Sequence, residues 1–311
     1  MGNETPTRAV KITVGIASLT AARQIERCLR ALEAQEDAPE FDLVVAHNPA
    51  LEGVAGLREK FPAVRFVGRV GWWAPIQLMA LAASEARGEI FMMTEDHCVP
   101  EPDWVRRLCD ALQTGRAAAG GPIDTRRDAT AAAWAFYFLD FFRYLSPVVE
   151  GVTPAISVCN VTYRRADLEA IRECWETGFH ETEVHWRLCA KHGPLWMEPK
   201  ARIIMLRNVG FGGAMGECYG QGRLFAAKRV EFADTKKRIF YLLLAPLLPV
   251  LLLIRRAQKG LSDAPGQFLK SLPALMAMVL AWSWGEGMGY LTRRPPQKLA
   301  LAEDIEAQEI E

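Results

Sequence analysis

The stretch from Gly88 to Trp104, GEIFMMTEDHCVPEPDW, is the most informative part of this chain for its fold and its site. Its apolar run, Ile90 to Met93, predicts a buried strand that ends in Glu95-Asp96-His97, before a proline-containing turn and a helix. Metal-binding side chains at the C-terminal end of a strand are typical of α/β enzyme sites. Carboxylates favour Mg²⁺ or Mn²⁺, and a histidine shifts the preference toward a transition metal. The alternative is an exposed acidic loop that binds nothing.

Strand-like and helix-like segments alternate on both sides of this stretch. Because such alternation is typical of right-handed crossovers, it predicts an α/β fold with a mostly parallel sheet flanked by helices. The predicted strands are Lys11–Ala17, Phe41–Ala46, Val64–Val67, Glu89–Met93 and Ile156–Tyr163, and the predicted helices include Ala22–Gln35 and Pro75–Glu85.

Composition and charge narrow the class of protein and its compartment. The 311 residues are enough for one large α/β domain with an appendage. Lys plus Arg and Asp plus Glu balance at 37 each, so no overall charge indicates a nucleic-acid partner. Seven cysteines without regular spacing indicate reduced thiols, and the polar opening MGNETPTRAVK predicts no signal peptide. We therefore expect a cytoplasmic catalytic part.

The last quarter of the chain changes character at Ile239. Residues 239–254 are an apolar run of about 24 Å as a helix, against about 30 Å of membrane hydrocarbon. A second run, residues 272–291, follows, and Lys and Arg flank both runs. Cations and aromatics at apolar ends indicate membrane association. Pro246 and Pro249 leave open an interfacial hairpin as well as two spans, and the alternative is a buried hairpin of a soluble domain. The predicted division is 1–230 catalytic domain, 231–295 membrane-associated helical hairpin and 296–311 polar tail.

Four segments, in this order, resemble the inverting glycosyltransferases of family 2. They are ITVGIASLTAARQIERCLRAL (12–32), EARGEIFMMTEDHCVPEPDWV (85–105), CNVTYRRADL (159–168) and FHETEVHWRLCAKHG (179–193). The resemblance covers most of residues 10–230 and is to the membrane-associated members with an apolar C-terminal tail. It implies the GT-A (Rossmann-like) fold and a divalent cation, Mn²⁺ or Mg²⁺, that neutralises the leaving diphosphate.

The resemblance also implies which residues bind the donor and the cation. The family's metal-binding aspartates fall on Glu95 and His97, so these two are the predicted metal ligands, and Asp96 between them orients or substitutes for them. The predicted nucleotide-binding residues are Ala17, Ser18, Thr20, Arg23, His47, Asn48, Glu95 and Asp96.

An inverting transfer also needs a base for the acceptor hydroxyl. The family's base aspartate falls on Thr182, which cannot serve, so its neighbours Glu181 and Glu183 are the predicted catalytic residues. They point in different directions at a helix start, and Glu181 is preferred because it matches the family's acidic position. The alternative is that they simply favour a helix N-terminus.

The resemblance, together with the basic and apolar tail, implies transfer of a sugar from a nucleotide-activated donor to a lipid-linked or envelope glycan acceptor. Other family positions differ, among them Met79-Ala80 where relatives place Arg-Asn, so the nucleotide and the sugar stay open. The alternative is a non-catalytic glycosyltransferase-like subunit that scaffolds a partner at the membrane. A nucleotidyltransferase is a third, weaker alternative.

Overall fold

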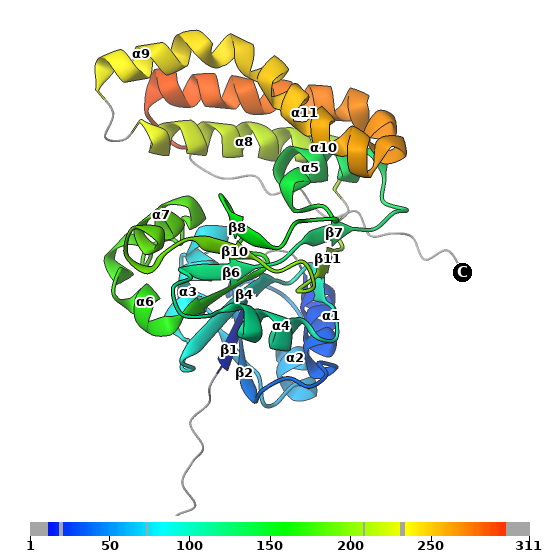
Figure 1. The fold of residues 1–311 in the computed structure, drawn as a ribbon, viewed down its shortest axis with the longest axis vertical. Helices are drawn as coiled ribbons and strands as arrows, with labels where there is room; N and C mark the ends of the chain where they lie inside the picture. Colours follow the sequence, from blue (N-terminus) through cyan, green and yellow to red (C-terminus); the bar gives the residue numbers. More distant parts are fainter. Residues whose placement is uncertain (1–11, 19–20, 73, 208, 231–233, 297–311) are drawn as a thin grey trace, which may run out of the picture. The chain divides into compact units, whose positions relative to one another are not determined.

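The computed structural model describes residues 12–18, 21–72, 74–207, 209–230 and 234–296. Contacts within the chain divide it into two units, one of residues 1–124 and 146–206 and the other of residues 125–145 and 207–311. Figure 1 shows the sheets of the first unit with their covering helices, and the helices of the second unit.

The first unit is built on a mixed, mostly parallel sheet. In the described residues, the strand order of the large sheet is β3-β2-β1-β4-β9-β6-β10-β8, and a small sheet has the order β5-β11-β7. Strand β1 pairs in parallel with β2 and β4, whereas β9 is antiparallel to both β4 and β6. The strands are β1 Ile12–Ser18, β2 Phe41–His47, β3 Arg65–Val67, β4 Ile90–Glu95, β5 Cys98–Pro100, β6 Ala118–Gly120, β7 Ile123–Thr125, β8 Gly151–Thr153, β9 Val161–Arg164, β10 Leu195–Met197 and β11 Ile203–Met205.

Helices cover this sheet and make up most of the second unit. The α-helices are α1 Ala22–Glu33, α2 Val54–Lys60, α3 Pro75–Ser84, α4 Trp104–Ala111, α5 Ala131–Asp140, α6 Arg165–Glu169, α7 Glu181–His192, α8 Phe211–Arg229, α9 Thr235–Leu244, α10 Leu248–Asp263 and α11 Pro265–Thr292. Three short 3₁₀ helices are η1 Phe142–Tyr144, η2 Arg172–Cys174 and η3 Ala245–Leu247.

The centre of the large sheet is buried on both faces, which explains its continuous apolar sequence. Every residue of β1 is buried, and α3 packs on it with residues 78–83 buried in succession. A strand covered on both faces reads as an unbroken apolar run rather than an alternating one. Gly15 is required in β1, because a Cβ at this position would lie 2.7 Å from the Phe91 ring.

The predicted strand Ile156–Tyr163 is wrong in its first half. The strand β9 begins only at Val161, and residues 157–160 form a turn closed by the Asn160 N–H, which donates to the Ser157 carbonyl at 2.9 Å. Apolar content alone misled the prediction, because Ile156 and Val158 are buried without being part of a ladder.

The second unit contains two helical stretches that are long and apolar enough to cross a membrane by length and composition, Thr235–Asp263 and Pro265–Thr292. In the first, only 6% of the most apolar window is buried, against 39% in the second. The first stretch is therefore largely exposed within this chain. Within the unit, α11 packs against α8, α5, α9 and α10.

Candidate active site

Three parallel strands end together at one edge of the large sheet. In the ladder registers, Ser18 at the end of β1 lies opposite His47 at the end of β2, and Ala17 lies opposite Glu95 at the end of β4. The Asp96 N–H extends this pairing by donating to the Ala17 carbonyl at 3.2 Å. The carboxyl edge of a parallel sheet is where α/β folds bind ligands. The sequence-predicted donor residues on these strands therefore lie side by side.

The acidic pair and the histidine after β4 are buried. Glu95 is 7% exposed, Asp96 1% and His97 2%, so the alternative of an exposed acidic loop is wrong. The Ser18 hydroxyl donates to Asp96 Oδ2 at 3.0 Å. Burying a carboxylate costs free energy unless charged or hydrogen-bonding groups compensate it. The neighbours of Glu95 and Asp96 therefore determine which chemical role these side chains can have.

His97 lies between the two carboxylates. Its Nε2 is 3.1 Å from Glu95 Oε2, and its Nδ1 is 3.4 Å from Asp96 Oδ1. Burial lowers the pKa of His97, but the neighbouring Cys98 sulfur and the carboxylates of Asp96 and Glu95 outweigh this, so the pKa lies well above its usual range. The ring thus lies between the carboxyl groups of Glu95 and Asp96.

This geometry tests which side chains suit a divalent cation. An imidazole binds a metal through the lone pair of a neutral ring nitrogen, and both nitrogens of His97 face carboxylates. Ligation by His97 would require its ring to leave both of them, whereas carboxylate oxygens are ordinary ligands of Mg²⁺ and Mn²⁺. Within the described part of the chain, no three His, Cys, Asp or Glu side chains are grouped to hold a metal. A cation that is bound by one or two carboxylates and by the phosphates of the substrate does not require three protein ligands.

Of the remaining predicted donor-binding residues, those that the structure describes lie at or beside the same edge. His47 is buried and its Nδ1 is 2.9 Å from the Asn48 carbonyl, while the half-buried Asn48 accepts the Ala50 N–H at 3.0 Å. Arg23 is exposed in the first turn of α1, which follows β1. Thr20 lies outside the described residues. The turn at Asn48 therefore places polar backbone and amide groups next to the end of β1.

The two predicted base residues have different surroundings, although both are in the first turn of α7. Glu181 is half-buried, and its Oε2 accepts the Val158 N–H at 3.1 Å. Val158 lies in the turn before β9, and since β9 runs antiparallel to β4 with Val161 opposite Met93, this turn lies beyond the end of β4. Glu181 is thereby held at the edge of the sheet that carries Glu95.

Glu183, by contrast, is a surface residue. Its side chain is 48% exposed and lies 3.7 Å from Arg187 Nη2, an i,i+4 ion pair of the kind that contributes little to stability. The two glutamates are two positions apart on a helix, so they point to widely separated sides of it. Of the two glutamates, it is Glu181 that contacts the turn at Val158.

Two positioning residues were missed in the sequence. Asn160 is fully buried: its amide donates to the carbonyls of Pro122 and Ala201 at 2.9 and 2.8 Å and accepts the Trp104 indole N–H at 2.8 Å. It fixes the turn that carries Val158. An amide between Cys159 and Val161 in an apolar segment was the available signal, because buried polar side chains require partners.

The second missed residue is His185, on the inner face of α7. Its Nε2 lies 2.8 Å from the Tyr163 hydroxyl, and burial lowers the pKa of His185 to about 4. The histidine is therefore neutral at pH 7, and it attaches α7 to β9. Together with Asn160, it determines where the first turn of α7 lies relative to the sheet edge.

Comparison with known families decides the class of this site. The model of the glycosyl transferase family 2 matches residues 13–172, which is more than half of the chain and includes β1, β2, β4 and β9. The chain belongs to glycosyl transferase family 2. Its chemistry is accordingly glycosyl transfer, and the site lies within and just beyond the matched region. No curated protein matches the sequence.

Solved structures place this family 2 chain in the GT-A fold. Residues 1–349 of TarS from S. aureus superpose with a TM-score of 0.51 at 14% identity, over 91% of this chain and 90% of that one. The mannosyltransferase PcManGT from Pyrobaculum calidifontis, solved in complex with GDP-Man and Mn²⁺, gives a TM-score of 0.53 at 15% identity over 90% and 88%. TarS was also solved in complex with UDP. At these identities the likeness is one of fold.

Proposed function

We propose that this protein transfers a sugar, with inversion, from a nucleotide-activated donor to a lipid-linked or envelope glycan acceptor at a membrane. The observation that carries the proposal is the convergence at one sheet edge of the ends of β1, β2 and β4 with Glu181 of α7. A donor and a general base must share one site for a single displacement.

On the donor side, we assign the nucleotide to the ends of β1 and β2. Ala17, Ser18, His47 and Asn48 line this edge, and Arg23 and Thr20 belong to the segment that follows β1. Support comes from structural neighbours that were solved with GDP-Man and with UDP. Because the two nucleotides differ and the identities are low, the proposal is for a nucleoside diphosphate sugar without naming the base.

Glu95 and Asp96 are the proposed ligands of a divalent cation, Mn²⁺ or Mg²⁺. When bound, the cation neutralises charge on the leaving diphosphate as a Lewis acid. In this arrangement the His97 ring keeps the two carboxylates close together, which would otherwise repel each other in a buried setting. His97 thus acts on the site through Glu95 and Asp96.

Glu181 is the proposed general base. Its carboxylate takes the proton of the acceptor hydroxyl as that oxygen attacks the anomeric carbon, while the bond from this carbon to the diphosphate oxygen breaks on the opposite side. Its half-buried position and the bond from the Val158 N–H hold one carboxylate oxygen in place. Glu183 fits this role less well, because it is exposed and paired with Arg187.

The membrane part of the proposal draws on the C-terminal helices. Two stretches meet the length and hydropathy of membrane helices, with mean hydropathies of 2.0 and 1.2. An enzyme attached to a bilayer on its cytoplasmic side can reach both a soluble nucleotide sugar and an acceptor on a lipid carrier. We therefore place the acceptor in the membrane and the catalytic unit in the cytoplasm.

Donor binding and hydrolysis test the proposal. Purified full-length protein is screened by thermal shift against UDP, GDP and other nucleotide sugars, with and without Mn²⁺, and each donor that binds is tested for release of nucleoside diphosphate. A donor at about a hundred times its Kd stabilises the protein by about 2.7 kcal/mol, which raises the Tm of a chain of this length by about 4 °C. Glu95→Ala should abolish the Mn²⁺-dependent part of the shift. Binding of no donor would refute the proposal, and binding without turnover would favour a scaffold subunit.

A further inference from the structure

The arm formed by α9, η3 and α10 carries a row of large, exposed apolar side chains. Phe240, Leu243, Leu247, Val250 and Ile254 recur at spacings of three and four residues and are between 52% and 72% exposed. This spacing places them along one side of a helix. A contiguous exposed row of this kind marks a surface that contacts something apolar.

The opposite side of the arm is fixed to the rest of the helical unit. Arg256 is buried, and its Nη2 donates to the Leu139 carbonyl at 2.7 Å, while Tyr241 stacks on Tyr290 of α11 with ring centroids 5.5 Å apart. Figure 1 shows α11 between α9 and α8, and α10 also packs against α11. The exposed row is therefore the outer face of a docked arm.

The packing of α11 argues against a hairpin that crosses the bilayer. Helix α8 approaches α11 closely: a Cβ at Gly285 would lie 2.1 Å from the Tyr219 carbonyl, and one at Gly222 would lie 2.3 Å from the Trp282 carbonyl. Helix α8 also carries Glu217, Arg223, Lys228 and Arg229. If α11 crossed the bilayer with this packing intact, α8 would bring its charged side chains toward the hydrocarbon core. Placing charged side chains there costs free energy.

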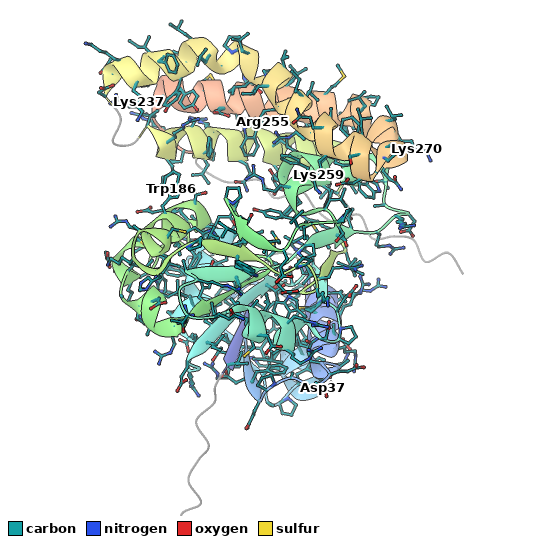
Figure 2. All side chains as sticks on the ribbon, viewed as in Figure 1. Asp37, Trp186, Lys237, Arg255, Lys259 and Lys270 are labelled. Atoms are coloured by element: carbon teal, nitrogen blue, oxygen red, sulfur yellow. The ribbon has the colours of Figure 1, made fainter. Side chains whose placement is uncertain are left out.

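Charge around the arm indicates the polarity of its partner. Residues 234–296 contain nine basic and three acidic residues, a net charge of +6, although the whole chain is neutral. Figure 2 shows Lys237 and Lys270 at opposite ends of the helical unit with Arg255 between them, and all three are exposed. Of the acidic residues, Glu286 is buried and Asp263 pairs with Lys259 at 2.6 Å. The exposed face is therefore apolar along its centre and positive around it.

We propose that the outer face of α9–α10 lies flat in the interface of an anionic bilayer leaflet. The apolar row inserts among the acyl chains to a depth of about 5–10 Å, and the basic side chains bind headgroup phosphates. This inference specifies how the protein is attached to the membrane in the proposed function. It rests on the membrane part of that proposal alone and does not depend on the sugar-transfer site.

Vesicle binding tests the surface. Full-length protein is sedimented with phosphatidylcholine vesicles that contain or lack phosphatidylglycerol. The double variant Leu243→Glu/Leu247→Glu should bind at least about a hundredfold more weakly, because the favourable burial of two leucine side chains among the acyl chains is lost. Val149→Glu, at an 88% exposed apolar position of the other unit, is the matched control and should bind normally. Wild-type affinity in the double variant would overturn the proposal.

A second variant tests the charge. Lys237→Gln/Arg255→Gln/Lys270→Gln should lose about a hundredfold in affinity for anionic vesicles, about fivefold for each cation, while its binding to neutral vesicles stays unchanged. Added salt should reproduce this loss in the wild-type protein. Equal binding of the wild-type protein to anionic and neutral vesicles would contradict the anionic part of the proposal.

Labelling distinguishes an in-plane arm from a crossing hairpin. Ser262→Cys places an exposed thiol near the end of α10, where a crossing hairpin would turn on the far side of the bilayer. In a background in which the partly exposed Cys109, Cys174 and Cys189 are replaced by serine, a membrane-impermeant maleimide added outside vesicle-bound protein should label the thiol fully before detergent is added, as it labels the control Asp37→Cys. Labelling only after detergent would overturn the proposal. Donor hydrolysis, measured on the same preparations without vesicles, reports on the proposed chemistry independently.

Discussion

Glu181→Gln separates catalysis from structure at the proposed base. The amide has the shape of the carboxylate and keeps an oxygen that can accept the Val158 N–H, now 3.1 Å from Glu181 Oε2. It cannot take a proton. Loss of a general base lowers rates by about 10²–10⁴, which corresponds to about 3–5 kcal/mol in the activation barrier. The free energy of unfolding should change by less than about 1 kcal/mol, because a single hydrogen bond is weakened and not lost.

Glu183→Gln is the matched control, since it makes the same chemical change two residues away. The Glu183 side chain is half exposed, and its ion pair with Arg187 spans 3.7 Å. Exposed pairs of this kind contribute about 0–1 kcal/mol to stability. We expect wild-type turnover in this variant and nearly the same urea midpoint.

The assay is release of nucleoside diphosphate under single turnover, with the donor that the thermal-shift screen identifies. The rate constant should fall in Glu181→Gln, while the Kd of the donor changes little, because the base contacts the acceptor. The reasoning would be refuted if Glu181→Gln kept more than about a tenth of the wild-type rate constant. It would also be refuted if Glu183→Gln lost as much activity as Glu181→Gln.

Three further predictions concern the supports of the site and the helical unit. Asn160→Ala breaks three buried hydrogen bonds and should lower the free energy of unfolding in urea by about 3–5 kcal/mol; a loss under about 1 kcal/mol would contradict its assigned role. Burial lowers the pKa of His185 to about 4, below the value of about 6.5 expected in the unfolded chain. The neutral His185 side chain therefore contributes about 3 kcal/mol to the free energy of unfolding above pH 6.5, and this contribution is lost as the pH falls toward 4, because the unfolded chain takes up the proton first. His185→Gln should remove that part of the pH dependence of the urea midpoint, and an unchanged slope would count against it. Gly285→Ala should destabilise the α8–α11 packing by about 1–3 kcal/mol in thermal unfolding, whereas Gly216→Ala, on α8 with open space around its Cβ, should be neutral or stabilising by up to about 1 kcal/mol.

The central strands and their carboxyl edge could be predicted because the information is local. Strands β1 and β4 are buried on both faces, so their apolar runs identify them, and the polar residues that end them, Ser18 and Glu95, necessarily meet at the edge of a parallel sheet. Helix α7 also begins at Glu181, within the segment where the sequence predicted it. The two apolar C-terminal stretches were equally visible, because length and hydropathy suffice to recognise them.

The sequence by itself therefore determined the fold class and the segments that supply the site, while only the tertiary structure decided what each side chain faces. Whether His97 turns to a metal or to carboxylates depends on Glu95 and Asp96 and on how deeply all three are buried, since burial and neighbouring charge set the proton occupancy of an imidazole. The difference between Glu181 and Glu183 arises from the turn at Val158, which Asn160 holds through partners about 40 to 56 residues away in the chain. Hydrogen bonds over such separations leave no periodic pattern in the sequence, so only the folded chain reveals them.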